Sequence, residues 1–149
     1  NLKSAVKWWT LSANQGCASA QHSLGLSYFK GEGVEKDLEW VVKWWTISAN
    51  QGYADSQFNL GSCYNNGDGV EKDSEQAIMW WTLSANQGYA KAQYNLGVGY
   101  YNGWGVQKNL ELAVKWWTLS AKQGNELARY NLGGVIITAM GLKRTWNRL

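Results

Sequence analysis

Residues 90–124 read AKAQYNLGVGYYNGWGVQKNLELAVKWWTLSAKQG, and this pattern returns along the chain at steps of 36 residues. Its tryptophan pair, at positions 116–117, recurs at positions 8–9, 44–45 and 80–81. A Leu-Gly pair in the first half and a closing glycine keep the same step. A fixed period of this length is the signature of a repeat protein, in which each unit is one supersecondary structure. Eight of the 11 tryptophans therefore come from one duplicated dipeptide.

The first half of each unit predicts a helix, which we name the A helix. In the second unit, Ser56, Leu60 and Tyr64 are spaced by four residues, which places small or apolar side chains on one face of a helix over residues 54–66. Gly67 and another glycine two positions later then end the helix, because glycine readily adopts the positive φ of a tight connection.

The second half of each unit predicts another helix, the B helix. Asp73 is a favourable N-cap for a helix over residues 74–86, and Gln76 stands at the spacing of a capping box. Gly88 follows the last turn as a C-terminal cap. The N-cap position of the neighbouring units is filled by Asp37 and Asn109.

Helices of about 13 residues are marginal in isolation, so each A–B pair must bury its apolar face against neighbouring pairs. Small residues and glycines of the A helices allow close approach, and we expect the tryptophan and tyrosine rings to fill the remaining volume. We therefore predict an all-α fold, an α-solenoid of 36-residue helix-turn-helix repeats with about eight helices. The absence of proline agrees with a chain made of helices and glycine turns.

A single domain is expected over residues 1–149. We divide it into a partial repeat with only a B helix at 1–17, full repeats at 18–53, 54–89 and 90–125, and a degenerate repeat with an A helix and a tail at 126–149. The chain opens inside an expected B helix, so we expect either that the native protein continues upstream or that this end pairs with another molecule. In the degenerate repeat, Ala139 replaces a turn glycine and Thr145 replaces a cap, which predicts a longer, irregular last helix.

One set of residues also carries a family resemblance. Ala-Gln-Tyr-Asn-Leu-Gly at 92–97 is followed by Tyr100, Gly103-x-Gly105-Val106, Asn109, Ala113, Trp116-Trp117, Ala121 and Gly124. This set, which recurs from residue 1 to about residue 133, resembles the Sel-one-like repeat (SLR) family, a relative of the tetratricopeptide repeat. The resemblance implies a right-handed α/α superhelix and an adaptor or scaffold role in which stacked repeats bind other proteins.

Two features depart from the family pattern. The usual basic residue after the aromatic pair is replaced by an apolar row, Leu11, Ile47, Leu83 and Leu119. This row either forms an exposed apolar strip for association or closes against the A helix of the following repeat, the interpretation that we favour. The chain also lacks the paired cysteines of a secreted branch described as β-lactamase-like. This absence argues against the hydrolase of that branch, which we keep as the alternative to a scaffold.

In tetratricopeptide-like stacks the A helices line the concave surface, so the resemblance implies a groove along the A-helix face that points away from the core. Its candidate partner-binding residues are His22, Leu26, Phe29, Asp55, Phe58, Asn59, Asn65, Lys91, Tyr94, Asn95, Tyr101 and Tyr130. The aromatic members act as peptide anchors or pack against the neighbouring A helix, and both interpretations remain open. For the repeated asparagines we favour hydrogen bonds of the side-chain amides between repeats over contacts with a peptide backbone.

The composition excludes several other classes of function. The net charge is +3, but Lys143, Arg144 and Arg148 lie in the last seven residues and the rest of the chain is neutral, which argues against nucleic acid as a partner. No apolar run is long enough for a membrane span. Cys17, Cys63 and the single histidine do not have the spacing of a zinc site, so we expect no metal and no cofactor. Two free cysteines favour a reducing compartment such as the cytoplasm.

The sequence therefore predicts a non-catalytic scaffold that binds a protein or peptide partner in the A-helix groove, with self-association through uncapped ends as a further expectation. The alternatives are the hydrolase and a repeat spacer within a larger signalling protein. With a single histidine, His22, a general base could still be a carboxylate, but the acidic residues lie at solvent-type positions, several of them in or before the first turn of a B helix, where the helix dipole favours them.

Overall fold

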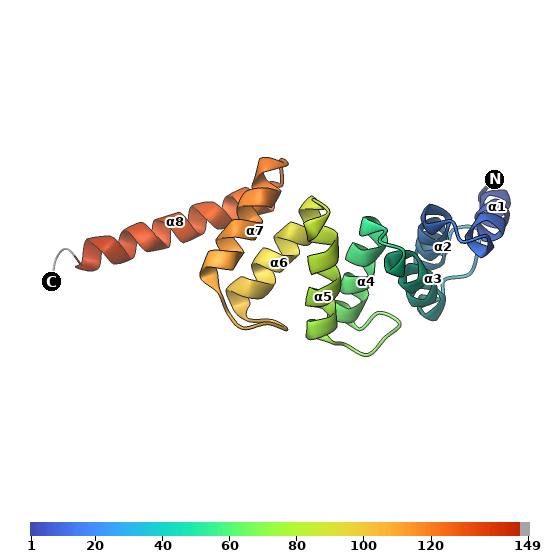
Figure 1. Cartoon of the computed structure of the whole chain (residues 1–149), viewed down its shortest axis with the longest axis horizontal. Helices are drawn as coiled ribbons and strands as arrows, with labels where there is room; N and C mark the ends of the chain where they lie inside the picture. The colour runs from blue at the N-terminus through green and yellow to red at the C-terminus, as the bar shows by residue number, and fades with distance from the viewer. Residues whose placement is uncertain (147–149) are drawn as a thin grey trace.

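The computed structural model describes the backbone of residues 1–146 and the side chains of residues 1–141 and 143. Over this part of the chain there are eight helices and no strand, which confirms the predicted all-α repeat fold (Figure 1). The helices are α1 (Leu2–Asn14), α2 (Ala18–Lys30), α3 (Leu38–Asn50), α4 (Ala54–Asn66), α5 (Ser74–Asn86), α6 (Ala90–Asn102), α7 (Leu110–Lys122) and α8 (Glu126–Trp146). Residues 147–149, the end of the degenerate repeat, lie outside the described residues.

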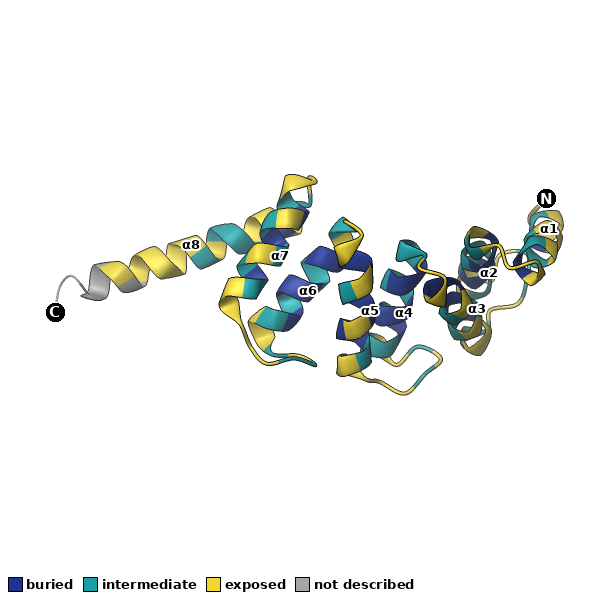
Figure 2. Cartoon of the chain, viewed as in Figure 1, coloured by how far each residue is buried: buried dark blue, intermediate teal, exposed yellow. Residues whose placement is uncertain are grey.

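The helices form an elongated row in which each one packs against the next in chain order (Figure 1). The A helices are α2, α4, α6 and α8, and the B helices are α1, α3, α5 and α7. The buried residues form four separate clusters, each shared by two or three successive helices. Figure 2 shows this burial as a line of dark patches along the stack, with α8 mostly exposed. Every unit is therefore stabilised by its immediate neighbours, as in other solenoids.

The second tryptophan of each pair explains the Leu-Gly motif of the A helix. The Trp45, Trp81 and Trp117 rings are buried, and a Cβ placed on Gly25, Gly61 or Gly97 would overlap with the corresponding indole. These glycines are required because only a bare backbone leaves room for the ring. We name this feature, an A-helix glycine with an indole packed on it, the glycine notch.

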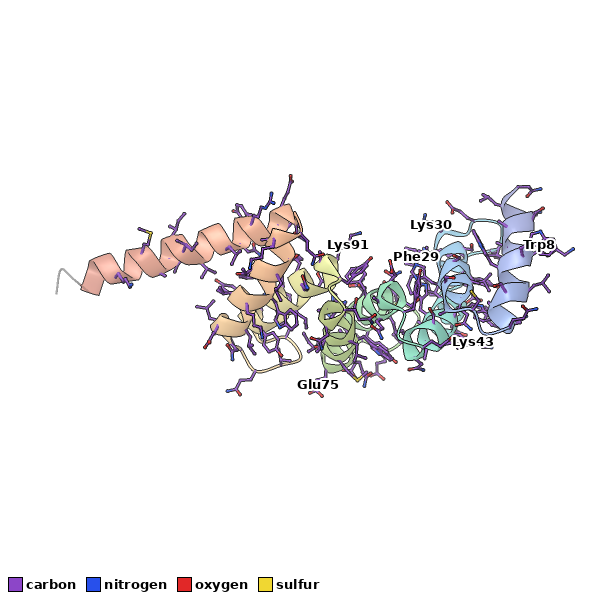
Figure 3. The ribbon with its side chains drawn as sticks, turned by 45° about the horizontal axis from the view of Figure 1, so that its top comes forward. Trp8, Phe29, Lys30, Lys43, Glu75 and Lys91 are labelled. Atoms are coloured by element: carbon purple, nitrogen blue, oxygen red, sulfur yellow. The ribbon has the colours of Figure 1, made fainter. Side chains whose placement is uncertain are left out.

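The first tryptophan of each pair is less uniform. Trp80 is buried, and Trp44 and Trp116 are half-buried against the cluster of the preceding unit. Trp8 is 68% exposed, so the expectation that every ring of the pairs fills the core is wrong for this residue. Figure 3 shows Trp8 pointing outward from α1 at the end of the row. The physical reason is that no other helix of the described chain covers this side of α1.

Buried polar side chains join the A and B helices at a fixed step. Ser48, Ser84 and Ser120 donate hydrogen bonds to the carbonyl oxygens of Ala18, Ala54 and Ala90 at 2.7–2.8 Å. A glutamine ladder accompanies them, because Gln51, Gln87 and Gln123 donate to the side-chain oxygens of Gln21, Gln57 and Gln93. This ladder lies within each repeat, and the glutamines of the A helices also join neighbouring repeats, because Gln21, Gln57 and Gln93 donate to the carbonyl oxygens of Ala13, Ala49 and Ala85.

The predicted caps are confirmed. Asp37, Asp73 and Asn109 accept hydrogen bonds from backbone N–H groups in the first turn of α3, α5 and α7. The backbone N–H of Asp73 donates to the carbonyl of Tyr64, which occupies the group that the reciprocal half of a capping box would use. Asn1 caps α1 in the same way, so α1 is a full B helix of 13 residues, and the expectation that the chain opens inside a helix is corrected.

Helix α8 has 21 residues, and this confirms the prediction of a longer last helix. Alanine at position 139 lacks the freedom of the turn glycine that ends α2, α4 and α6, so the helix continues through the place of the turn.

The row of Leu11, Ile47, Leu83 and Leu119 is 37–48% exposed on the B helices. The favoured interpretation, that this row closes against the following A helix, is wrong. The inner faces of the B helices are already filled by the tryptophan, serine and alanine positions.

Candidate functional site

The A-helix face has two hollows, and five of the predicted groove residues line them. The larger hollow has a volume of about 710 Å³ and lies between α6, α7 and α8. The smaller has a volume of about 250 Å³ and lies between α4, α5 and α6. Tyr94 lines both hollows, so the two adjoin across this side chain.

The larger hollow is aromatic. Tyr94, Tyr101 and Tyr130 line it together with Trp117, whose ring centroid lies 5.4 Å from that of Tyr101. Tyr94 is half-buried against the cluster of α7 and α8, whereas Tyr130 is 80% exposed. Tyr94 therefore forms part of the packed wall, whereas Tyr101 and Tyr130 are exposed to solvent.

The smaller hollow is more polar. Asn65 and Asn95 line it, and Asn65 donates a hydrogen bond of 3.1 Å to the side chain of Asn66. Among the side chains that the structure describes, Asn59, Asn95 and Asn131 have no hydrogen-bond partner. We favoured the interpretation that these three asparagines form side-chain hydrogen bonds between repeats, and this interpretation is therefore wrong.

His22 and Phe58 lie outside both hollows and pack against the next A helix. The Phe58 ring lies 5.2 Å from that of Tyr89, which is the N-cap residue of α6. The His22 ring lies 5.3 Å from that of Tyr53, the N-cap residue of α4. At these two positions the structure supports the packing interpretation of the aromatic row.

His22 also begins a directed chain of hydrogen bonds. Its Nδ1 lies 3.0 Å from Oγ of Ser56, and Ser56 donates to Oγ of Ser48, which donates to the carbonyl of Ala18. Because the Ser56 hydroxyl proton is used in this chain, Ser56 accepts from His22, and Nδ1 carries the proton. Burial lowers the pKa of His22, and the nearby Asp55 carboxylate opposes that shift. The ring is therefore held neutral in one tautomer.

The other predicted residues are spread along α2, α4 and α6. Leu26 packs against the cluster of α3, α4 and α5, and Phe29 is exposed with its centroid 5.9 Å from that of Trp45. Asp55 is half-buried and raises the pKa of Tyr89, although burial is the larger cause. Asn59 is half-buried, and Lys91 is exposed at the start of α6 (Figure 3).

Several residues that line the hollows are absent from the candidate set, among them Val98, Trp104, Arg129 and Ile137. Val98 lies on the same helical stripe as Tyr94 and Tyr101, so helical spacing in the sequence already indicated that it faces the groove. Arg129 is the one charged residue among the described residues that line the larger hollow, and its Nε donates to the carbonyl of Ala121 at 3.3 Å. Trp104 lines the smaller hollow from the turn between α6 and α7, where the repeat pattern has no aromatic residue.

The described side chains contain no cluster of three His, Cys, Asp or Glu residues that could hold a metal ion. Cys63 is buried, and burial raises the pKa of its thiol to about 12. Cys17 is exposed, and hydrogen bonds, first from Ser19 and then from Ser12, lower its pKa to about 7. None of the helices in the described part of the chain has the length and apolar character needed to cross a membrane.

Comparison with known proteins agrees with this architecture. The Sel1 repeat family matches residues 1–17, 18–53, 54–89 and 90–125. The structure is similar to that of c5321, a protective antigen of uropathogenic Escherichia coli with an SLR fold, at 34% identity and a TM-score of 0.90 over 94% of this chain and 30% of that chain. A Sel1 repeat protein from Oxalobacter formigenes matches at 34% identity and a TM-score of 0.84 over 90% of this chain and 55% of that chain.

Cysteine-rich protein B of Helicobacter pylori shares the fold at 23% identity, with a TM-score of 0.71 over 89% of this chain and 98% of that chain. No curated protein matches the sequence. The chain spans 30% and 55% of the lengths of the two proteins that it matches at 34% identity. Four successive matches to one repeat, together with the helical stack that they form, show that the chain belongs to the Sel1 repeat family.

Proposed function

We propose that this chain is a non-catalytic interaction module that binds a peptide or domain of a partner protein along its A helices. The family supports this proposal, because Sel1 repeat proteins are generally non-enzymatic protein-interaction scaffolds. The hollow of about 710 Å³ between α6, α7 and α8 is the main binding site in this proposal. The observation that supports it is the gathering of Tyr94, Tyr101 and Tyr130 around one hollow.

The chemistry of the hollow favours a particular kind of peptide. Tyrosine offers a large apolar ring with a polar tip at a low cost in conformational entropy, and it is enriched at the energetically dominant positions of interfaces. The described residues that line the larger hollow include no carboxylate, and Arg129 contributes a positive charge. The site is therefore suited to an apolar or aromatic anchor residue with an acidic group beside it.

The neighbouring hollow extends this site along the stack. The amide of Asn95 has no partner among the described side chains, and an amide supplies both a donor and an acceptor to the backbone of an extended peptide. Tyr94 separates the two hollows, so a peptide that crosses it would place one side chain in each.

The experiment is selection of a random peptide library displayed on phage against the immobilised 149-residue chain, followed by calorimetric titration of the enriched peptides. Tyr101→Ala combined with Tyr130→Ala should weaken binding by about 30-fold or more, since aromatic anchors at interfaces contribute about 2 kcal/mol. Both side chains are exposed, so the fold should be retained, and far-ultraviolet circular dichroism checks it.

Met79→Ala is the matched control, because Met79 is an exposed apolar residue on α5 that lines neither hollow. An equal loss of affinity in this variant would contradict the proposed site. A library that yields no binder would favour the spacer interpretation. Turnover of a β-lactam by the purified chain, abolished when one carboxylate is replaced, would show the hydrolase instead.

A further inference from the structure

A third hollow lies at the turn between α6 and α7. Its volume is about 460 Å³, within the range of about 300–1,000 Å³ that is usual for ligand sites. It is lined by Tyr100, Val106, Gln107, Lys108, Asn109 and Leu112. All six residues belong to the third full repeat, and none of them lines either hollow of the A-helix face. The third hollow is therefore formed within one repeat and is separate from the proposed partner site.

The first full repeat shows what the equivalent position holds. Tyr28 and Trp40 are the equivalents of Tyr100 and Leu112, two repeats earlier in the chain. The Trp40 indole is stacked on the Tyr28 ring, with the ring centroids 5.9 Å apart and an angle of 18° between the planes. In the third repeat a leucine replaces this indole, and a hollow lies beside Tyr100 instead.

A lysine covers the stacked ring of the first repeat. Nζ of Lys43 lies 4.0 Å from the centroid of the Trp40 ring, which is within the distance of cation–π attraction. The same lysine recurs as Lys115, which is exposed on α7 with its Nζ 5.9 Å from the Trp116 ring centroid. The third repeat therefore keeps the cation but lacks the ring that the cation covers.

The turn of the third repeat also carries fewer carboxylates than that of the first. Gln107 and Asn109 replace Glu35 and Asp37, whereas Lys108 keeps the lysine that stands between them. The described residues that line the third hollow therefore include one positive charge and no carboxylate. This charge pattern favours an aromatic ring with acidic groups beside it.

We propose that the third hollow binds the tryptophan side chain of a partner polypeptide in which acidic residues flank that tryptophan. The indole would stack on Tyr100 as Trp40 stacks on Tyr28, and Lys115 would cover its outer face as Lys43 covers Trp40. This site goes beyond the proposed function, because one repeat holds the ligand at its turn and the hollows of the A-helix face take no part.

The test is the fluorine NMR spectrum of a synthetic peptide, acetyl-Glu-Asp-Trp-Asp-Glu-amide with a fluorinated tryptophan, titrated with the 149-residue chain. Only the peptide carries fluorine, so the 11 tryptophans of the chain give no signal. The expected result is a shift or broadening of the fluorine line that saturates with a dissociation constant below about 1 mM. An unlabelled peptide with alanine in place of the tryptophan should not compete.

Two variants locate the bound peptide. Leu112→Trp copies Trp40 and fills the hollow with an indole of the chain itself, so it should weaken binding by about tenfold or more. Gln76→Trp is the matched control, because residue 76 has the equivalent position in the second full repeat and does not line this hollow, so it should bind like the parent chain. Trp40 shows that a folded repeat accommodates an indole at this position, and far-ultraviolet circular dichroism checks both variants.

Tyr130→Ala separates this inference from the proposed function, because Tyr130 lines the larger hollow and should not affect this peptide. Binding that is lost in Tyr130→Ala and kept in Leu112→Trp would place the peptide in the larger hollow, which would overturn this inference and leave the proposed function. A peptide that does not bind the parent chain at concentrations up to about 1 mM would also overturn it. Equal competition by the alanine peptide would do the same.

Discussion

The indole N–H of Trp117 donates a hydrogen bond of 3.2 Å to the backbone carbonyl of Tyr94. The equivalent bonds join Trp45 to His22 and Trp81 to Phe58 at the same distance. A carbonyl inside a helix already accepts a bond from the residue four positions later, so the indole uses its second lone pair. The aromatic residues His22, Phe58 and Tyr94 of α2, α4 and α6 are thus tied to the core through their backbones, while their side chains remain free to differ between repeats.

Filling an occupied notch should destabilise the fold. Gly97→Ala places a methyl group where the Trp117 ring lies, so the free energy of unfolding should fall by about 1–3 kcal/mol. Gly133→Ala is the control, because its notch is empty and alanine is the better helix former, so stability should rise by about 0.5–1 kcal/mol. Urea unfolding at low protein concentration measures both. Equal stabilities for the two variants would contradict the role of the notch.

The buried serines should differ in how much each contributes to the free energy of unfolding. Ser120→Ala removes one hydrogen bond and leaves the Ala90 carbonyl without that partner, which should cost about 1–2 kcal/mol. Ser48→Ala should cost more, because Ser48 also accepts from the buried hydroxyl of Ser56. The double variant Ser48→Ala, Ser56→Ala should cost about as much as Ser48→Ala, because it removes the unpaired Ser56 hydroxyl but leaves the His22 Nδ1–H without its acceptor. Chemical denaturation of the three variants decides the order.

Stability should fall when the pH drops below the ordinary pKa of histidine. Burial lowers the pKa of His22 in the folded chain below 6.5, so the unfolded chain takes up the proton first as the pH falls. The contribution of neutral His22 to the free energy of unfolding is fully present above pH 6.5 and is lost as the pH falls from that value through the folded-state pKa. His22→Phe, which copies Phe58, should make the difference in stability between about pH 7.5 and about pH 5.5 smaller. A proton NMR titration of the single histidine gives its pKa directly.

The two cysteines should react at very different rates. The pKa of Cys17 is about 7 and its side chain is exposed, so near neutral pH a large fraction is the nucleophilic thiolate. Cys63 is buried with a pKa of about 12, so iodoacetamide should modify it only when the chain is unfolded. Mass spectrometry of peptides after a timed reaction should find the label on Cys17 alone. Ser19→Ala should slow the reaction near neutral pH, because it removes the largest cause of the lowered pKa.

Local signals predicted the helices and turns because each depends on a few neighbouring residues. The expected bounds 54–66 and 74–86 agree with α4 and α5, and the cap at Asp73 was read from its own side chain and the turn that follows. The loss of one glycine at position 139 was enough to predict a last helix longer than the others. The repeat step then supplied the all-α stack, since helices of this length require neighbours.

Side-chain partners between repeats could not be read in the same way. The apolar row that includes Leu83 was expected to be covered, but Leu83 is exposed. Side-chain hydrogen bonds between repeats were expected of residues such as Asn95, but Gln93 makes the bond, to the carbonyl of Ala85. A residue that recurs every 36 positions can lie on the buried or on the exposed face of its helix. The repeat period is the same in both cases, so it does not tell the two faces apart. The gathering of Tyr94, Tyr101 and Tyr130 around one hollow depends on how far α8 lies from α6.

The sequence by itself determined the repeat, its helices, its turns and its caps, because those follow from short-range spacing and backbone preference. Tertiary structure alone decided which ring of each tryptophan pair is buried, which amides form the ladder and where the stack leaves space for a partner. Those outcomes depend on the angle and distance between helices that are far apart along the chain, and one-dimensional periodicity does not specify these quantities.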